Sequence, residues 1–133
     1  MQLPNLPLTV LDTETTGFIP KVHRVMEFAS MRVEGGKIVD RYEQLFSVPE
    51  IPPIVAAITH IHQSMLEGQP KFEEKRDEVA KHIGAGDILV GQNLGFDIGM
   101  LKGEGIDLTE RPWIDTSMLA SLVFPELPRY SLG

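Results

Sequence analysis

The arrangement of this chain follows from one stretch of its sequence, Val10-Leu11-Asp12-Thr13-Glu14-Thr15-Thr16-Gly17. Apolar residues lead directly into two carboxylates that are separated by one residue. Side chains alternate between the faces of a strand, so Asp12 and Glu14 would share one face of a strand over Leu8–Thr13. Like charges that lie close together are costly unless a cation compensates them, and a divalent metal ion is the natural candidate. After the strand come three residues whose hydroxyls and backbone N–H groups suit a phosphate or sugar: Thr15, Thr16 and Gly17.

A second stretch repeats this arrangement, with a strand leading to a polar turn and an acid. It reads Leu89-Val90-Gly91-Gln92-Asn93-Leu94-Gly95-Phe96-Asp97. Ligands of open α/β sheets bind beyond the carboxyl ends of the strands, so Asp97 is expected to converge on Asp12 and Glu14. Each acid also has a plain alternative. Asp12 and Glu14 alone suit an ordinary polar turn, and Asp97 alone suits a helix cap.

The remaining pattern predicts an α/β fold with a mixed sheet. Strands are expected over residues 25–33 and 37–48, joined by a turn at Gly35-Gly36, and again over 87–91 and 112–115. Helices are expected over residues 54–61, 70–83, 96–102 and 116–124, the second with Phe72, Val79 and Ile83 facing inward. We take residues 1–133 as a single domain.

Composition excludes several classes of protein. The chain has 133 residues, no cysteine and a formal net charge of −7. There is no disulfide framework or thiolate zinc site, and no apolar run long enough to cross a membrane. No secretory leader is recognisable, so we expect a cytoplasmic protein without a membrane partner. An acidic chain disfavours broad duplex binding, but a carboxylate site loaded with cations would be locally positive.

Taken together, the two stretches resemble the first two motifs of the DEDD exonuclease superfamily, in the branch that contains the proofreading subunit of bacterial replicative DNA polymerase. The first motif matches Leu11-Asp12-Thr13-Glu14-Thr15-Thr16-Gly17-Phe18. The second matches Gln92-Asn93-Leu94-Gly95-Phe96-Asp97, with Gln92 where the family commonly has histidine. Weaker likenesses lie at residues 51–61, 115–120 and 129–133. The resemblance implies a ribonuclease H-like fold, a mixed β-sheet flanked by helices.

The resemblance also implies an activity, namely hydrolysis of nucleotides from a nucleic-acid 3′ end with two Mg²⁺ or Mn²⁺ ions. Asp12 would bridge both ions, Glu14 would bind the ion on the nucleophile side, and Asp97 would hold the other. The substrate would be a single-stranded 3′ end of DNA or RNA, with a polymerase or another replication protein as partner. The residues expected to contact the terminal nucleotide are Thr15, Thr16, Gly17, Phe18, Thr59, Asn93 and Phe96.

The family site also needs a histidine and a fourth acid beyond the Arg129–Gly133 segment, and this sequence has neither there. We therefore expect the domain to be C-terminally incomplete, without its final helices, inactive as written, and able to self-associate through an uncovered sheet face. His23 is expected in the loop after the first strand and His82 in solvent, while His60 and His62 lie near the expected nucleotide pocket. The competing hypotheses are a non-catalytic nucleotide-binding module and an α/β interaction domain without a site.

Overall fold

The computed structural model describes residues 6–117 of the chain. Five strands form one mixed sheet in the order β3-β2-β1-β4-β5. Strand β1 (Leu8–Thr15) lies at the centre, antiparallel to β2 (Val25–Glu34) and parallel to β4 (Ile88–Gly91). β3 (Lys37–Leu45) and β5 (Trp113–Asp115) form the two edges. This is the mixed sheet that the sequence pattern predicted, and it agrees with the fold that the family resemblance implies.

The long hairpin of β2 and β3 turns at Gly35 and Gly36, whose positive φ angles of 57° and 75° suit a tight turn. β1 pairs with β2 along its whole length, but it pairs with β4 only from Leu8 to Val10. Beyond Val10, the β4 side of β1 is therefore open to the segment that follows β4. This gap in the sheet is where the start of the next helix enters.

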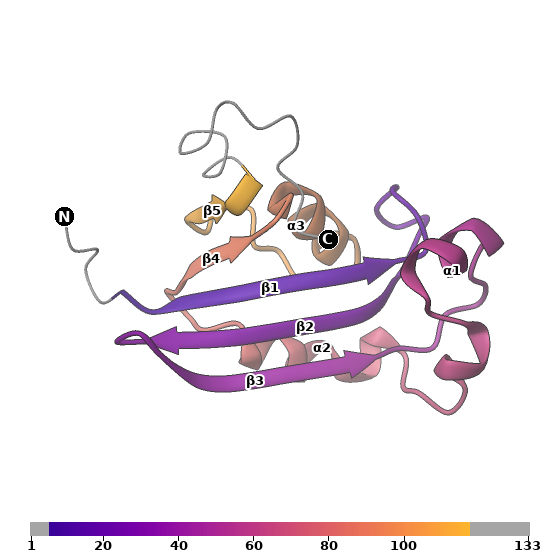
Figure 1. Ribbon diagram of the computed structural model, residues 1–133, viewed down its shortest axis with the longest axis horizontal. Coiled ribbons are helices and arrows are strands. Elements are labelled where there is room, and N and C mark those ends of the chain that lie inside the picture. Colours follow the sequence, from indigo (N-terminus) through magenta and orange to yellow (C-terminus); the bar gives the residue numbers. More distant parts are fainter. Residues whose placement is uncertain (1–5, 118–133) are drawn as a thin grey trace.

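Two helices cover one face of the sheet (Figure 1). α2 (Phe72–His82) packs on β2 and β3, and α3 (Leu94–Gly103) packs on β1 and β5. The expected inward residues of α2 are confirmed, since Phe72, Val79 and Ile83 are all buried. They join the main core with residues of the sheet and of α3, among them Leu11, Phe28, Leu89, Leu94, Ile98 and Leu101.

A smaller unit lies at the end of the sheet, where α1 (Pro53–Thr59) and the 3₁₀ helix η1 (Gln63–Leu66) close a second core. Pro53 opens α1, because proline is tolerated in the first turn of a helix. None of the residues of α1 is fully buried. The second core is formed instead by residues around α1, namely Met26, Val48, Ile51, Ile61 and Leu66.

The sheet face opposite α2 and α3 carries apolar side chains in a row across three strands. Val10, Val90 and Ile114 are register partners, and Val10 and Ile114 are 37% and 43% exposed. Self-association through this face stays a prediction. No helix within residues 6–117 is long and apolar enough to cross a membrane. The expected helix over 116–124, and the family's final helices, lie wholly or mostly outside the described residues.

The expectation for His82 is wrong. Its ring stacks on Tyr42 with centroids 4.0 Å apart, and its Nδ1 lies 2.7 Å from a carboxylate oxygen of Asp40. The ring is therefore held between α2 and β3 and is not simply solvated. Sequence periodicity placed His82 on the charged side of α2, but the neighbouring strand β3 supplies a polar and an aromatic partner for it there. His23, by contrast, lies in the expected loop, where its Nδ1 accepts a hydrogen bond from the N–H of Ile19.

Candidate carboxylate site

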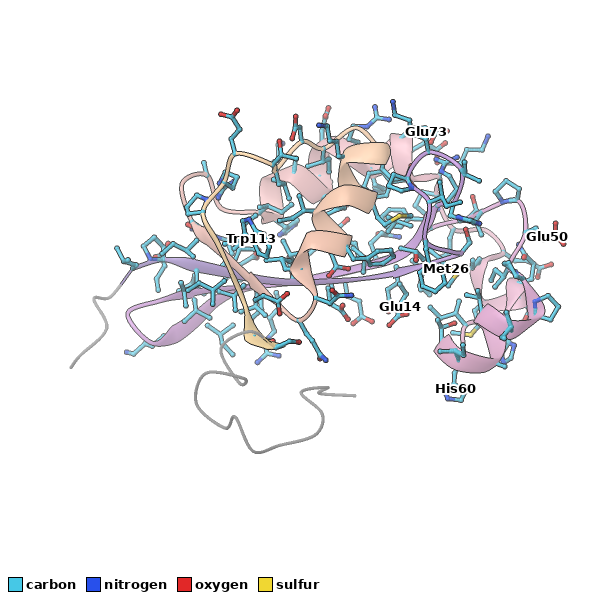
Figure 2. All side chains as sticks on the ribbon, turned by 90° about the horizontal axis from the view of Figure 1, so that it is seen from above. Glu14, Met26, Glu50, His60, Glu73 and Trp113 are labelled. Carbon is cyan, nitrogen blue, oxygen red and sulfur yellow. The ribbon has the colours of Figure 1, made fainter. Side chains whose placement is uncertain are left out.

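β1 carries two of the expected acids on the face of the sheet away from α2 and α3. Leu11 and Thr13 are buried on the helix-covered face, so Asp12 and Glu14 point to the other face by the alternation of the strand. Figure 2 shows Glu14 on this side of the sheet. The period-two argument from the sequence therefore placed both side chains correctly.

α3 brings the third acid to β1 through the gap beyond β4. A Cβ atom on Gly91 would lie 2.9 Å from the carbonyl oxygen of Leu11, so only glycine lets β4 end this close to β1. The chain then turns at Asn93, whose φ is 54°, and enters α3 at Leu94. Asp97 is thus within the first turn of α3 and is not its cap. Its carboxylate accepts a hydrogen bond from the hydroxyl of Thr13.

The three acids line one cleft of about 330 Å³, together with Thr13, Gln92, Asn93 and Phe96. Burial raises the pKa of Asp97 to about 7, with a further contribution from the charges of Asp12 and Glu14, although the hydrogen bond from Thr13 opposes the change. Burial also raises the pKa of Asp12 and of Glu14, and the charge of Asp12 adds to the effect on Glu14. The cleft therefore concentrates negative charge that the protein alone does not neutralise.

A further carboxyl group beside the cleft was missed in the sequence. Glu27 on β2 is the register partner of Glu14. Burial raises the pKa of Glu27, and a hydrogen bond with Glu43 and the charges of Glu14 and Asp12 raise it further. The sequence shows acids on both β1 and β2, but it does not show which residue of one strand lies opposite which residue of the other. The position of Glu27 beside Glu14 is therefore known only from the strand register.

The donor chemistry of this cleft fits a hard divalent cation, which prefers carboxylate oxygens. Among residues 6–117, no three His, Cys, Asp or Glu side chains form a group that could hold a metal ion by themselves. The hydroxyl of Thr13 donates a hydrogen bond to one oxygen of the Asp97 carboxylate. Mg²⁺ usually retains several water ligands, so it does not require a complete protein cage.

The loop after β1 is shaped by its own hydrogen bonds. The Thr15 hydroxyl donates to the Gly17 carbonyl, and the buried Thr16 hydroxyl accepts from the N–H of Arg24. A Cβ atom on Gly17 would fall 2.4 Å from the ring of His23, so a larger residue here would displace that ring. The nucleotide contacts expected of these residues stay predictions.

Two aromatic rings lie beside the carboxylates. Phe18 is 82% exposed, and its ring centroid is 6.0 Å from that of Phe96, which lines the cleft. The hydroxyl of Thr59, at the end of α1, donates to the Val55 carbonyl and accepts from the N–H of Ile61, which follows the helix. Its expected nucleotide contact also stays a prediction.

Asp115 at the end of β5 holds the start of α3. Its carboxylate accepts hydrogen bonds from the N–H groups of Asn93, Leu94 and Ser117, at 3.1, 3.2 and 2.9 Å. The first two are donors that would otherwise lack partners at a helix N-terminus, and a negative charge there is favourable. Asp115 thereby holds the turn that positions Asp97. This role depends on a contact between distant segments, so local sequence patterns do not predict it.

Comparison with known proteins agrees with this geometry. The family model described as exonuclease matches residues 9–133. A DNA polymerase III of PolC type from Halalkalibacterium halodurans is 34% identical over 130 residues, which cover 93% of this chain and 9% of that protein. The DNA polymerase III subunit epsilon of Treponema pallidum is 33% identical over 131 residues, which cover 95% of this chain and 60% of that protein.

Among solved structures, exonuclease X in complex with 5′ overhanging duplex DNA superposes with a TM-score of 0.73 and 30% identity, covering 93% of this chain and 68% of that one. The described sheet order and the helices on one face are therefore those of a known exonuclease fold. The match of the family model to nearly the whole sequence, together with the three acids lining one cleft, leads to one conclusion: the chain belongs to the exonuclease family.

Proposed function

We propose that this chain is the catalytic domain of a metal-dependent 3′–5′ DNA exonuclease. The observation that carries the proposal is the convergence of Asp12, Glu14 and Asp97 on one cleft. Burial raises the pKa of all three, and neighbouring charges add to the effect on Glu14 and Asp97. A divalent cation would stabilise the ionised carboxylates of such a cleft, because it relieves the repulsion among them. The names of the relatives, which include polymerase III chains and an exonuclease bound to DNA, favour DNA as the substrate.

Four residues of the cleft would hold or orient the cations. Asp12, Glu14 and Asp97 would hold Mg²⁺ or Mn²⁺. When bound, two such ions activate a water molecule and stabilise the leaving 3′ oxygen. Thr13 keeps the carboxylate of Asp97 oriented by its hydrogen bond.

Other residues would receive the terminal nucleotide. The paired rings of Phe18 and Phe96 offer an apolar surface for its base. Asn93, Thr15, Thr16 and Gly17 would surround its sugar and phosphate, and Thr59 would approach from α1. The domain would act beside a replicative polymerase or another replication protein, a role that rests on the relatives' names alone.

The test is an exonuclease assay on the natural full-length protein. Single strands labelled at the 5′ end should shorten stepwise from the 3′ end with Mg²⁺ or Mn²⁺, and chelation should stop the reaction. Asp12→Asn should abolish trimming without unfolding the protein, whereas Asp107→Asn, on an exposed loop, should not. An RNA strand of the same sequence decides between the two nucleic acids.

A second outcome would identify a different function. If the full-length protein binds nucleotides but trims no strand with either cation, and Asp12→Asn changes nothing, the chain is a binding module and the proposal is wrong. The engagement of Asp97 by Thr13 is the observation that favours this alternative, because it occupies one oxygen of a proposed metal ligand.

A further inference from the structure

The loop after the carboxylate motif lies along one face of α3. Phe18 contacts Phe96, a Cβ on Gly99 would lie 3.9 Å from Pro20, and a Cβ on Gly103 would lie 2.8 Å from the backbone nitrogen of Lys21. Positions 96, 99 and 103 are three and four residues apart, so they share one side of the helix. The loop therefore follows α3 from the carboxylate cleft to the far end of the helix, about 10 Å away along its axis.

At that end the surface forms a basic pocket of about 400 Å³. It is lined by Lys21, Arg24, Arg76 and Lys102, with the segment 103–105 as its remaining wall. A neighbouring hollow of about 520 Å³ shares Lys21 and Arg24 with it and reaches Thr16. The two hollows thus form one continuous concave surface from the basic pocket to Thr16, two residues after Glu14. In a chain of formal net charge −7, four cations around one pocket are unexpected.

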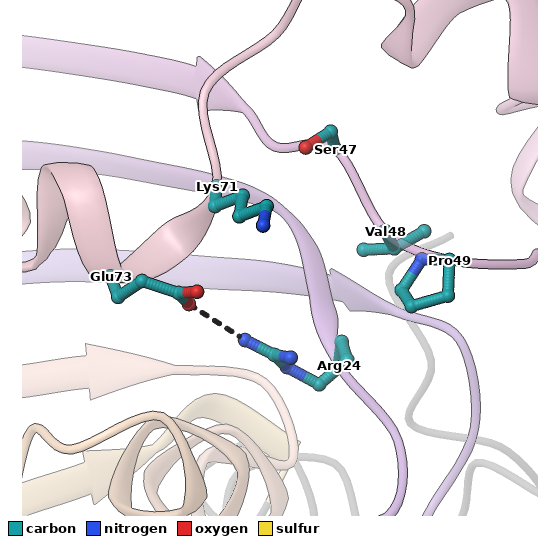
Figure 3. Close-up of a pocket in the computed structure, with 6 residues that line it drawn as sticks. All are labelled: Arg24, Ser47, Val48, Pro49, Lys71 and Glu73. Carbon is teal, nitrogen blue, oxygen red and sulfur yellow. Dashed lines mark hydrogen bonds and ion pairs between the residues drawn. The ribbon is translucent and has the colours of Figure 1, made fainter.

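Two of the four cations have structural partners. Arg24 bonds Glu104 through its Nε, at 3.0 and 3.1 Å, and pairs with Glu73 at 3.1 Å, as Figure 3 shows for the latter pair. Glu104 is buried and also accepts the N–H of Val25. Arg76 donates its Nε to the Glu104 carbonyl at 2.8 Å. These contacts build the floor of the pocket and hold both arginines in place.

The two lysines have no such partners. Within residues 6–117, neither the Lys21 nor the Lys102 ammonium group forms a hydrogen bond or an ion pair. The pKa of nearby Asp107 is lowered mainly by hydrogen bonds from Thr109, and the charge of Lys102 lowers it further. Both side chains are exposed. An ammonium group on a flexible stem suits a phosphate as a mobile point charge, and neutralising phosphates is the main source of affinity for nucleic acids.

We propose that the pocket formed by Lys21, Arg24, Arg76 and Lys102 binds a backbone phosphate of the nucleic acid, at a distance from the nucleotide in the carboxylate cleft. This inference rests on the proposed function, since it assumes a nucleic-acid strand in that cleft. The pocket supplies non-specific affinity that the acidic surface lacks. The phosphate belongs either to the strand being trimmed or to its complement.

The test measures binding rather than turnover, with Ca²⁺ in place of the catalytic ions. Lys21→Gln and Lys102→Gln are compared with Lys37→Gln, which removes a charge from the hairpin turn between β2 and β3, outside the residues lining the pocket and the cleft. The ligands are a deoxynucleoside monophosphate, a ten-nucleotide single strand, and a duplex with a 5′ overhang. Binding is followed by fluorescence anisotropy from 50 to 200 mM salt.

The expected result is weaker binding of polymers by both pocket variants. For each phosphate that a variant no longer neutralises, the slope of log affinity against log salt should fall by about 0.9 for the duplex and about 0.7 for the single strand. Monophosphate binding and the Lys37→Gln variant should be unchanged. Weaker binding of the single strand assigns the phosphate to the trimmed strand, and weaker binding of the duplex alone assigns it to the complement. Normal polymer binding by both pocket variants, or an equal weakening for the monophosphate, overturns the proposal. Absence of any binding by the unmodified protein would instead count against the proposed function.

Discussion

The hydroxyl of Thr13 donates a hydrogen bond to the carboxylate of Asp97 and so ties the central strand to the first turn of α3. Thr13 points into the helix-covered side of β1 while its neighbours Asp12 and Glu14 point to the other side. One strand therefore supplies two proposed metal ligands and orients the third. A bond to the charged form of a carboxyl group lowers its pKa, which opposes the effect of burial on Asp97.

Thr13→Val should therefore raise the pKa of Asp97 further. A hydrogen bond worth about 1 kcal/mol corresponds to about 0.7 pH unit. Because a metal ligand must be deprotonated, the pH at which Mn²⁺ binding is half-maximal should move upward by about that amount. Calorimetric titration from pH 5 to 9 measures it. Thr109→Val, which removes an exposed Thr–Asp bond on the loop after α3, is the control. An unchanged midpoint would show that Thr13 does not hold the ionised carboxylate.

Asp97→Asn should stabilise the metal-free protein at neutral pH. The pKa of Asp97 rises from 3.8 to about 7 on folding, so the folded state binds its proton more tightly than the unfolded state. Stability from this group is present below pH 3.8 and is lost as the pH rises toward 7. Removing the charge should gain on the order of 1–3 kcal/mol at pH 8 and little at pH 4. Urea unfolding at both pH values measures this difference.

The Asp87→Asn substitution should change the stability in the opposite direction, and it therefore serves as the control for that prediction. Its pKa is lowered mainly by a hydrogen bond from Arg32, which lies 2.9 Å away, with the Thr9 hydroxyl as a further donor at 2.8 Å. Asp87→Asn should destabilise the protein, more at pH 7 than at pH 3, because the lowered pKa contributes stability only above the unfolded value. If both substitutions changed stability in the same direction at pH 8, the assignment of Asp97 as a buried, unneutralised acid would be wrong.

What the sequence alone revealed depended on local pattern. β1 and the shared face of Asp12 and Glu14 follow from a period of two, and the inward residues of α2 follow from helical spacing. The bounds differed by a few residues, since β1 continues to Thr15 and α3 starts at Leu94. Propensity changes gradually at element ends, whereas hydrogen bonding to neighbouring strands decides where they stop.

The missed features all depend on contacts between segments far apart in the chain. Glu27 lies beside the cleft only because β2 places it opposite Glu14. His82 acquires partners from β3, and Asp115 acquires its role from the N-terminus of α3. Asp97 was placed by fold logic and family likeness together, because no spacing in the sequence records that β4 stops at Gly91 and leaves β1 open. Local pattern therefore located Asp12 and Glu14, fold logic and family likeness added Asp97, and only the fold revealed what positions these side chains.

Asp115→Ala should loosen the start of α3 and, through it, the proposed ligand Asp97. Removing an N-terminal cap costs about 1–2 kcal/mol, and here the carboxylate accepts from both Asn93 and Leu94. Hydrogen exchange of these two amides should accelerate about tenfold or more, and Mn²⁺ affinity should fall although Asp115 does not line the cleft. Asp107→Ala, which removes a carboxylate that accepts hydrogen bonds from Thr109 in its own loop, is the control. If amide exchange accelerated but Mn²⁺ affinity did not fall, Asp115 would cap α3 without helping to position Asp97 for the metal ion.

His60→Gly should stabilise the protein. His60 ends α1 with a φ of 61°, a left-handed conformation in which a side chain costs about 1 kcal/mol and glycine costs nothing. Its side chain is exposed, so little packing is removed. Allowing for the greater freedom of glycine in the unfolded chain, the net gain should be about 0.5 kcal/mol. His62→Gly is the matched control, because His62 has a φ of −108° and should gain nothing from glycine. Thermal unfolding of the two variants against the unmodified chain measures the difference, and equal melting temperatures would contradict the strain assigned to His60.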